Sequence, residues 1–118
     1  MPQDLNYLSD IIQAAHLIQQ FVEGFEQNDF VADVMRQDAV IRRLAIIGEA
    51  VQQLSGTFKT GHPEIPWKEM AGMRNILIHN YNKVDIVRVW VTIRNDIPAL
   101  IAQIEPLVPP EEDNPLTK

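Results

Sequence analysis

The chain has 118 residues, of which 46% are hydrophobic and 22% charged, and its formal net charge is −6. This length predicts one domain, with enough apolar residues to build a core. The lack of cysteine excludes disulfides, thiolate metal sites and a cysteine nucleophile. The acidic balance argues against broad wrapping of nucleic acid, which needs a basic face, but it leaves room for a small basic cleft.

The sequence contains neither a secretion signal nor a membrane-spanning segment that we can recognise. The first ten residues, MPQDLNYLSD, are polar and lack the apolar core of a signal peptide. No apolar run approaches the roughly 20 residues that a membrane-spanning helix requires. We therefore expect a cytoplasmic protein that makes no membrane contact, and the absence of cysteine agrees with a reducing compartment.

The first half of the chain reads as helices. Apolar residues recur at helical spacing over residues 5–25, with Gly24 and Asn28 as stop signals. The stretch NDFVADV predicts a short helix capped by Asn28 or Asp29. A third helix follows, closed by Ser55-Gly56, because five apolar residues are spaced by 4, 3, 4 and 3: Val40, Leu44, Ile47, Val51 and Leu54.

The second half predicts two more helices. TGHPEIP is expected to be a loop, and Pro66 is well suited to be the first residue of a helix over 66–81. Residues 86–104 are rich in β-branched side chains, yet their apolar residues keep helical spacing over 19 positions, too long for a typical strand. Pro98 lacks a backbone donor and should kink or split this last helix.

These elements predict an all-α fold, an up-down bundle of four long helices plus a short one. We expect one helical domain over residues 1–108. Residues 109–118 form a proline-rich, acidic tail that we expect to be disordered.

The helix predicted over 66–81 ends on an unusual cluster, Arg74, His79 and Tyr81. Residues four and seven apart share a helix face, which aligns Asn75 with His79 and Arg74 with Tyr81. Arg74 and His79 are separated by about 140° around the axis. A long arginine, local unwinding or a second copy of the chain is needed to bring them together.

Cleavage of RNA without a metal is the chemistry that suits this cluster. The 2′-hydroxyl must lose a proton to attack phosphorus, and the leaving 5′-oxygen must gain one. Histidine titrates near neutral pH and serves either role, while arginine forks onto phosphate oxygens and holds the developing negative charge. Asn75 is a supporting candidate that orients the imidazole or a phosphate oxygen.

One histidine is few for both an acid and a base, so a two-fold homodimer with facing clusters would complete the site. A structural alternative explains the same residues. Arg74 would pair with a nearby acid such as Glu69 or Asp85, and His79 would simply end a helix, where positive charge is favoured.

The motifs also resemble a known family. MRNILIHNY is similar to the R-x4-6-H signature of the HEPN superfamily. Together with QDAVIRRLAIIGEAV, IPWKEMAGMRNILIHNYNKVD and VWVTIRNDIPAL, it resembles the HepT-like toxin branch, in the same order from about Leu5 to Leu107. The resemblance implies an all-α, dimeric, metal-independent ribonuclease that acts as a toxin beside an MntA-type nucleotidyltransferase antitoxin.

The resemblance also implies roles for single residues. Arg74 and His79 match the catalytic pair, and Asn75 matches the polar residue that follows the arginine. Tyr81 matches the tyrosine that the antitoxin adenylylates to silence the toxin. Such a modification would place negative charge beside Arg74, where it competes with the RNA phosphate.

Two further predictions concern the rest of the chain. Arg42 and Arg43 are possible RNA contacts at the cleft edge, although a solvated face explains them as well. No histidine has partners at metal-ligand spacing, so we expect no metal site and no cofactor. The rival functions are a non-catalytic helical module that binds a nucleotide or a nucleotidyltransferase partner, and an inactive relative of the toxins.

Overall fold

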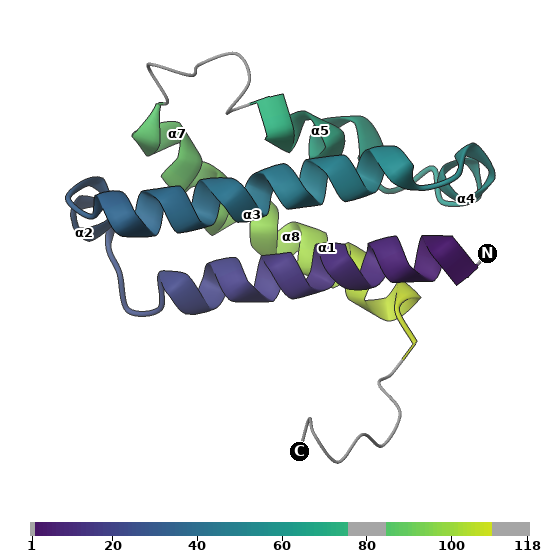
Figure 1. Ribbon diagram of the computed structural model, residues 1–118, viewed down its shortest axis with the longest axis horizontal. Coiled ribbons are helices and arrows are strands. Elements are labelled where there is room, and N and C mark those ends of the chain that lie inside the picture. The colour runs from purple at the N-terminus through teal and green to yellow at the C-terminus, as the bar shows by residue number, and fades with distance from the viewer. Residues whose placement is uncertain (1, 76–84, 110–118) are drawn as a thin grey trace.

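The computed structural model describes residues 2–75 and 85–109 (Figure 1). Its elements are α1 (Pro2–Phe21), α2 (Gln27–Val31), α3 (Val34–Gln53), α4 (Gly56–Thr60), α5 (Trp67–Ala71), the 3-10 turn η1 (Gly72–Arg74), α7 (Ile86–Val91), the π-helical turn η2 (Thr92–Asp96), α8 (Ile97–Ile104) and the 3-10 turn η3 (Glu105–Leu107). Within these two ranges there is no strand. The predicted all-α bundle is confirmed.

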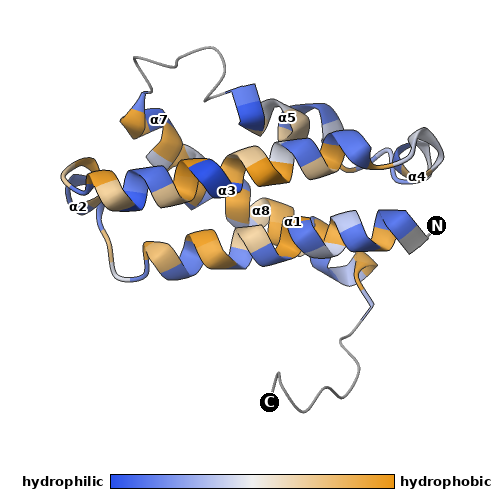
Figure 2. Cartoon of the chain, in the orientation of Figure 1, coloured by the Kyte–Doolittle hydropathy of each residue, from blue (hydrophilic) through white to orange (hydrophobic). Residues whose placement is uncertain are grey.

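The two longest helices, α1 and α3, pack side by side and run in opposite directions, and α7 and α8 pass behind them (Figure 1). Along both helices apolar and polar residues alternate in short blocks, as one buried stripe per helix requires (Figure 2). The core between α1, α3 and α8 contains Leu8, Ile11, Ile18, Val40, Leu44, Ile47, Ile97, Leu100 and Ile104.

Two boundaries in the first half differ from the prediction. The N-cap of α2 is Glu26, not Asn28 or Asp29. Asp29 lies in the first turn of the helix, where its carboxylate accepts a hydrogen bond from the backbone N–H of Glu26 (2.8 Å). Ser55 does follow the end of α3, but it also begins α4, because its Oγ accepts a hydrogen bond from Phe58 N (3.1 Å). The short helix α4 was missed.

The later elements follow the predicted course with local changes. Pro66 is the N-cap of α5 and not its first residue. Residues 86–104 are helical as expected, in three pieces: α7, η2 and α8. The backbone N–H of Ile97 donates to Thr92 O, five residues back, as a π-helical turn requires, and this turn ends two residues before Pro98. A kink of the helix axis at Pro98 stays a prediction.

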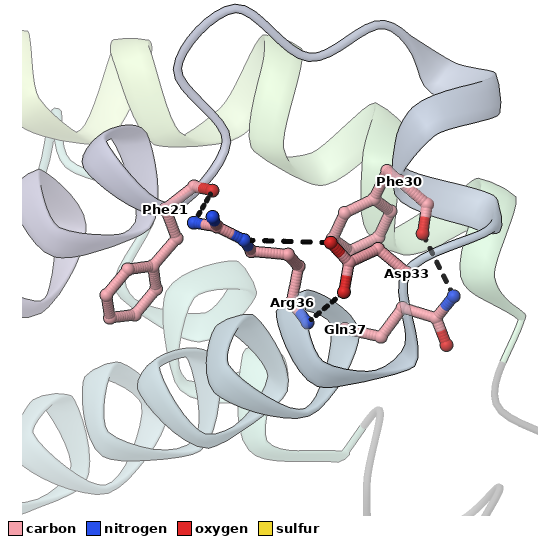
Figure 3. A network of polar contacts seen from close by, with 5 residues as sticks. All are labelled: Phe21, Phe30, Asp33, Arg36 and Gln37. Atoms are coloured by element: carbon pink, nitrogen blue, oxygen red, sulfur yellow. Dashed lines mark hydrogen bonds and ion pairs between the residues drawn. The ribbon is translucent and has the colours of Figure 1, made fainter.

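Arg36 ties the end of α1 to the start of α3 (Figure 3). Its Nη1 donates to Phe21 O (2.7 Å), its Nε lies 3.7 Å from the Asp33 carboxylate, and its guanidinium stacks over Phe25 at 5.2 Å. Asp33 also caps α3 by accepting from the Arg36 backbone N–H (3.0 Å). Arg36 is therefore part of the scaffold.

Across the two described ranges, no helix combines the length and the apolarity needed to cross a bilayer. The predicted tail is described only to residue 109, and residues 110–118 lie outside the described part.

A buried carboxylate joins the N-terminus to the turn after α3. Asp4 accepts hydrogen bonds from Ser55 N and from Ser55 Oγ, both at 2.8 Å, and it is 3% exposed. These two hydrogen bonds lower the pKa of Asp4 below its ordinary value of 3.8, and the bond from the Ser55 backbone N–H has a larger effect than the bond from its hydroxyl.

This contact predicts acid-sensitive stability. Because the folded-state pKa of Asp4 is lowered, its contribution is complete above pH 3.8 and is lost as the pH falls through the lower folded value. Asp4→Asn should therefore lower the urea midpoint at pH 7, and the gap from wild type should narrow below pH 4. As a control, Asp10→Asn on the same helix should leave the midpoint nearly unchanged, since Asp10 is exposed. A gap that does not depend on pH would contradict this account.

Candidate active site

The predicted site is described in part. Arg74 is the half-buried last residue of η1, and Asn75 follows it as an exposed C-cap whose N–H donates to Gly72 O. His79 and Tyr81 lie outside the described residues. The structure therefore positions the arginine and its polar neighbour, and it leaves the approach of His79 to Arg74 a prediction.

Buried anchors fix the segment that carries Arg74. The indole Nε1 of Trp67 donates to Lys59 O (3.1 Å) and His62 O (3.0 Å), which attaches the start of α5 to the turn after α4. Met70 and Met73 are buried, three residues apart on the face that turns toward the core. Arg74 follows the second anchor directly, so its backbone is held by packing.

Gly48 allows this segment to lie directly on α3. A Cβ atom added at Gly48 would come within 2.7 Å of Arg74 N, 2.8 Å of Ala71 O and 2.9 Å of Arg74 Cβ. Two of these three atoms belong to the backbone, which cannot move aside without shifting the whole segment. A glycine is therefore required where Arg74 meets α3.

The guanidinium of Arg74 is held by a neutral side chain. Its Nη1 donates to Oε1 of Gln52, which lies on α3 four residues after Gly48 and so on the same face. Its Nε is buried and has no hydrogen-bond partner among the described residues. Sequence reasoning missed Gln52, because the spacing of residues within α3 does not show which side chain meets Arg74.

Among the described residues, no carboxylate lies within ion-pair distance of Arg74. Glu69 and Asp85, the two partners that the structural alternative named, are therefore not paired with it. Asp85 has another role, because its Oδ1 accepts a hydrogen bond from Arg88 N (3.1 Å) and caps α7. In the part of the chain that is described, the arginine keeps its charge uncancelled.

A pocket of about 420 Å³ opens beside Arg74, between α1 and α3. Its lining combines an aromatic ring, two carboxylates, two amides and the arginine: Tyr7, Asp10, Ile46, Glu49, Ala50, Gln52, Gln53 and Arg74. Glu49 is exposed. The pocket is open to solvent and offers both hydrogen-bond donors and acceptors next to the arginine.

The two other candidate arginines differ in exposure. Arg42 is exposed and lies seven residues before Glu49, on the same face of α3. Arg43 is half-buried and is turned about 100° away from it. Contact of either residue with RNA stays a prediction. Over residues 2–75 and 85–109, no three His, Asp or Glu side chains lie close enough together to hold a metal ion.

Comparison with known proteins identifies the family. Residues 11–107 match the family described as Ribonuclease HepT-like. The chain belongs to the HepT-like ribonuclease family. This confirms the resemblance noted in the sequence, and it confirms the expectation of a ribonuclease at the level of the family.

Individual relatives agree with this assignment. The chain is 48% identical over 102 residues to a "Probable ribonuclease HepT" of Thermococcus cleftensis, covering 86% of this chain and 93% of the relative. It is 41% identical over 106 residues to a "Putative RNase" of Caldanaerobacter subterraneus, covering 90% and 95%. A "Putative RNase" of Methanocaldococcus jannaschii is 38% identical over 99 residues, covering 84% and 91%. No solved structure was found to match this chain.

The contact at Gly48 makes a stability prediction. Gly48→Ala should destabilise the fold by about 1–3 kcal/mol, because the added methyl group overpacks against the backbone of α5 and η1. The free energy of unfolding in urea measures this loss. Gly72→Ala is the matched control, since an added Cβ there meets no atom within 4 Å. Equal stability of the two variants would contradict the close approach.

Proposed function

We propose that this protein is a metal-independent endoribonuclease, the toxin of a toxin–antitoxin pair, with Arg74 and His79 as its catalytic residues. The observation that carries the proposal is Arg74 itself. Its segment is packed firmly against α3, its guanidinium is held by a neutral amide, and a solvent-open pocket lies beside it. This is the arrangement that an anion-binding residue needs.

The proposed reaction is a transesterification. The 2′-hydroxyl loses its proton to a base and attacks the adjacent phosphorus, and the bond to the 5′-oxygen breaks as that oxygen gains a proton. The products are a 2′,3′-cyclic phosphate and a 5′-hydroxyl end. His79 moves one of these protons, Arg74 holds the phosphoryl oxygens, and Asn75 orients the imidazole or the phosphate.

A homodimer would supply a second His79 for the other proton transfer. Exposed apolar side chains support self-association. They lie on α2, the start of α3 and α7, elements that adjoin at one end of the molecule (Figure 1): Val31, Val34, Met35, Val87 and Val91. Met35 is 80% exposed and Val34 is 66% exposed, which is costly in water unless a partner covers them.

The regulatory part of the proposal rests on the resemblance of the motif MRNILIHNY to the toxin branch. A nucleotidyltransferase antitoxin of the MntA type would adenylylate Tyr81 and silence the enzyme. The added phosphate would compete with RNA for Arg74. We assign this pair to the cytoplasm, where its RNA substrates are found.

The catalytic proposal predicts cleavage in excess EDTA. Arg74→Ala and His79→Ala should each reduce the rate by about 10²–10⁴-fold, the usual loss when a charge-stabilising group or a general acid–base is removed. A time course on end-labelled RNA, with circular dichroism to verify folding, measures this. Arg94→Ala is a control and should cleave RNA as the wild type does. Arg94 is an exposed arginine that stacks on Trp90 in α7 and is not part of the proposed site. Wild-type protein that binds RNA without cutting it would favour the rival, a non-catalytic module.

The dimer makes a separate prediction. Met35→Lys should shift the protein toward the monomer, because it places a charge in the apolar patch. Sedimentation equilibrium measures the change. Leu5→Lys is the matched control, since Leu5 is 40% exposed in the first turn of α1, a helix whose N-terminal end lies far from α2 (Figure 1). If both variants associate as wild type does, this patch is not the dimer interface.

The regulatory proposal predicts site-specific modification. Incubation with ATP and a nucleotidyltransferase of the MntA type should add AMP to the wild type and not to Tyr81→Phe, as intact-mass spectrometry would detect. The modified wild type should lose cleavage. Labelling of both proteins to the same extent would place the modification elsewhere.

A further inference from the structure

The partner of Arg74 is an amide although carboxylates are near. Asp10 and Glu49 line the same pocket, yet the guanidinium of Arg74 donates to Oε1 of Gln52. Gln52 carries no net charge. It therefore fixes the direction of the guanidinium and leaves the full positive charge of the arginine in place.

The difference between an amide and a carboxylate matters for a phosphate ligand. A carboxylate at this position would form a charge-assisted pair with the guanidinium, and an incoming phosphate would have to displace it. An amide competes weakly, because a hydrogen bond between a neutral acceptor and arginine is weaker than one between two ions. The guanidinium has five N–H donors, and the bond to Gln52 accounts for one nitrogen only.

Gln52 and Gly48 act on the same residue from the same face of α3. Gly48 sets the position of the Arg74 backbone, and Gln52 sets the direction of its guanidinium. Both lie within one long helix, a more rigid support than a loop. The side chain of Arg74 is thereby ordered before RNA arrives, which removes part of the entropy cost of binding.

We propose that Gln52 is a positioning residue of the ribonuclease, which holds the guanidinium of Arg74 at the pocket edge while leaving its charge available to an RNA phosphate. This inference rests on the proposed function. Gln52 touches the arginine and acts through it.

The test compares Gln52 with a glutamine outside the site. Gln19 lies on α1, is exposed like Gln52 and is not among the described residues that line the pocket, so Gln52→Glu and Gln19→Glu add the same charge inside and outside the site. Two assays are needed: cleavage of RNA, and binding of the same RNA made uncleavable by 2′-O-methylation at several salt concentrations. Unfolding in urea confirms that each variant folds.

We expect Gln52→Glu to weaken binding and cleavage by about tenfold or more, and to reduce the salt slope of binding toward that of Arg74→Ala, by about 0.7 for one lost phosphate contact. Gln52→Ala should keep the wild-type salt slope and KM but lower kcat by about tenfold, because a misdirected guanidinium fits the transition state poorly. Gln19→Glu and Gln19→Ala should stay within about threefold of wild type in both assays.

The outcomes separate the two proposals. If Arg74→Ala impairs cleavage while the Gln52 variants match the Gln19 variants, the positioning role is wrong and the proposed function stands. If wild type and Arg74→Ala bind RNA equally and neither cleaves it, the proposed function fails and the inference fails with it. A uniform loss of stability in both Gln52 variants, with an unchanged salt slope in Gln52→Glu, would indicate a purely structural role.

Discussion

The contact between α3 and the segment after α5 determines where this protein presents its charge. At Gly48 the backbone of η1 lies so close to the helix that no side chain fits between them. Met70 and Met73 hold the same segment from the core side. Arg74 therefore emerges at a fixed point on the surface of a rigid two-helix scaffold, and its direction is set by a second residue of α3, Gln52.

Net charge and local charge have different consequences in this chain. A net charge of −6 disfavours general attraction to RNA, so binding depends on a few placed cations. Arg36 is used by the scaffold, bonded to Phe21 O and paired with Asp33. Arg74 has no carboxylate partner among the described residues. An acidic body that presents Arg74 beside a pocket, without a carboxylate partner among the described residues, is suited to a ligand that is recognised through a phosphate.

Periodicity predicted most of the fold, because the buried stripes of α1, α3 and α8 depend on residue type and spacing alone. It also decided correctly that the β-branched run over 86–104 is helical. It failed at helix ends: the cap at Glu26 and the helix begun by Ser55 depend on hydrogen bonds that apolar spacing does not encode. The π-helical turn before Pro98 was likewise not foreseen, since it follows from local backbone bonding.

The sequence predicted which residues form the candidate site better than it predicted how other elements hold them. The motif around Arg74 indicated a ribonuclease, and the family comparison agrees with that class of enzyme. The support from α3 was not predicted. Which side chain holds the guanidinium depends on the rotation of α3 relative to η1, a tertiary property that spacing within one helix does not fix.

The central claim is that Arg74 serves a transesterification at an RNA phosphate. The most direct measurement maps cleavage of an RNA that carries a single 2′-deoxynucleotide on the 5′ side of an established cut site, in excess EDTA. The account predicts that cleavage disappears at that phosphate alone and continues at the other sites, which yield 2′,3′-cyclic phosphate ends. Undiminished cleavage at the deoxy position would show that the 2′-hydroxyl is not the nucleophile, and would contradict the account.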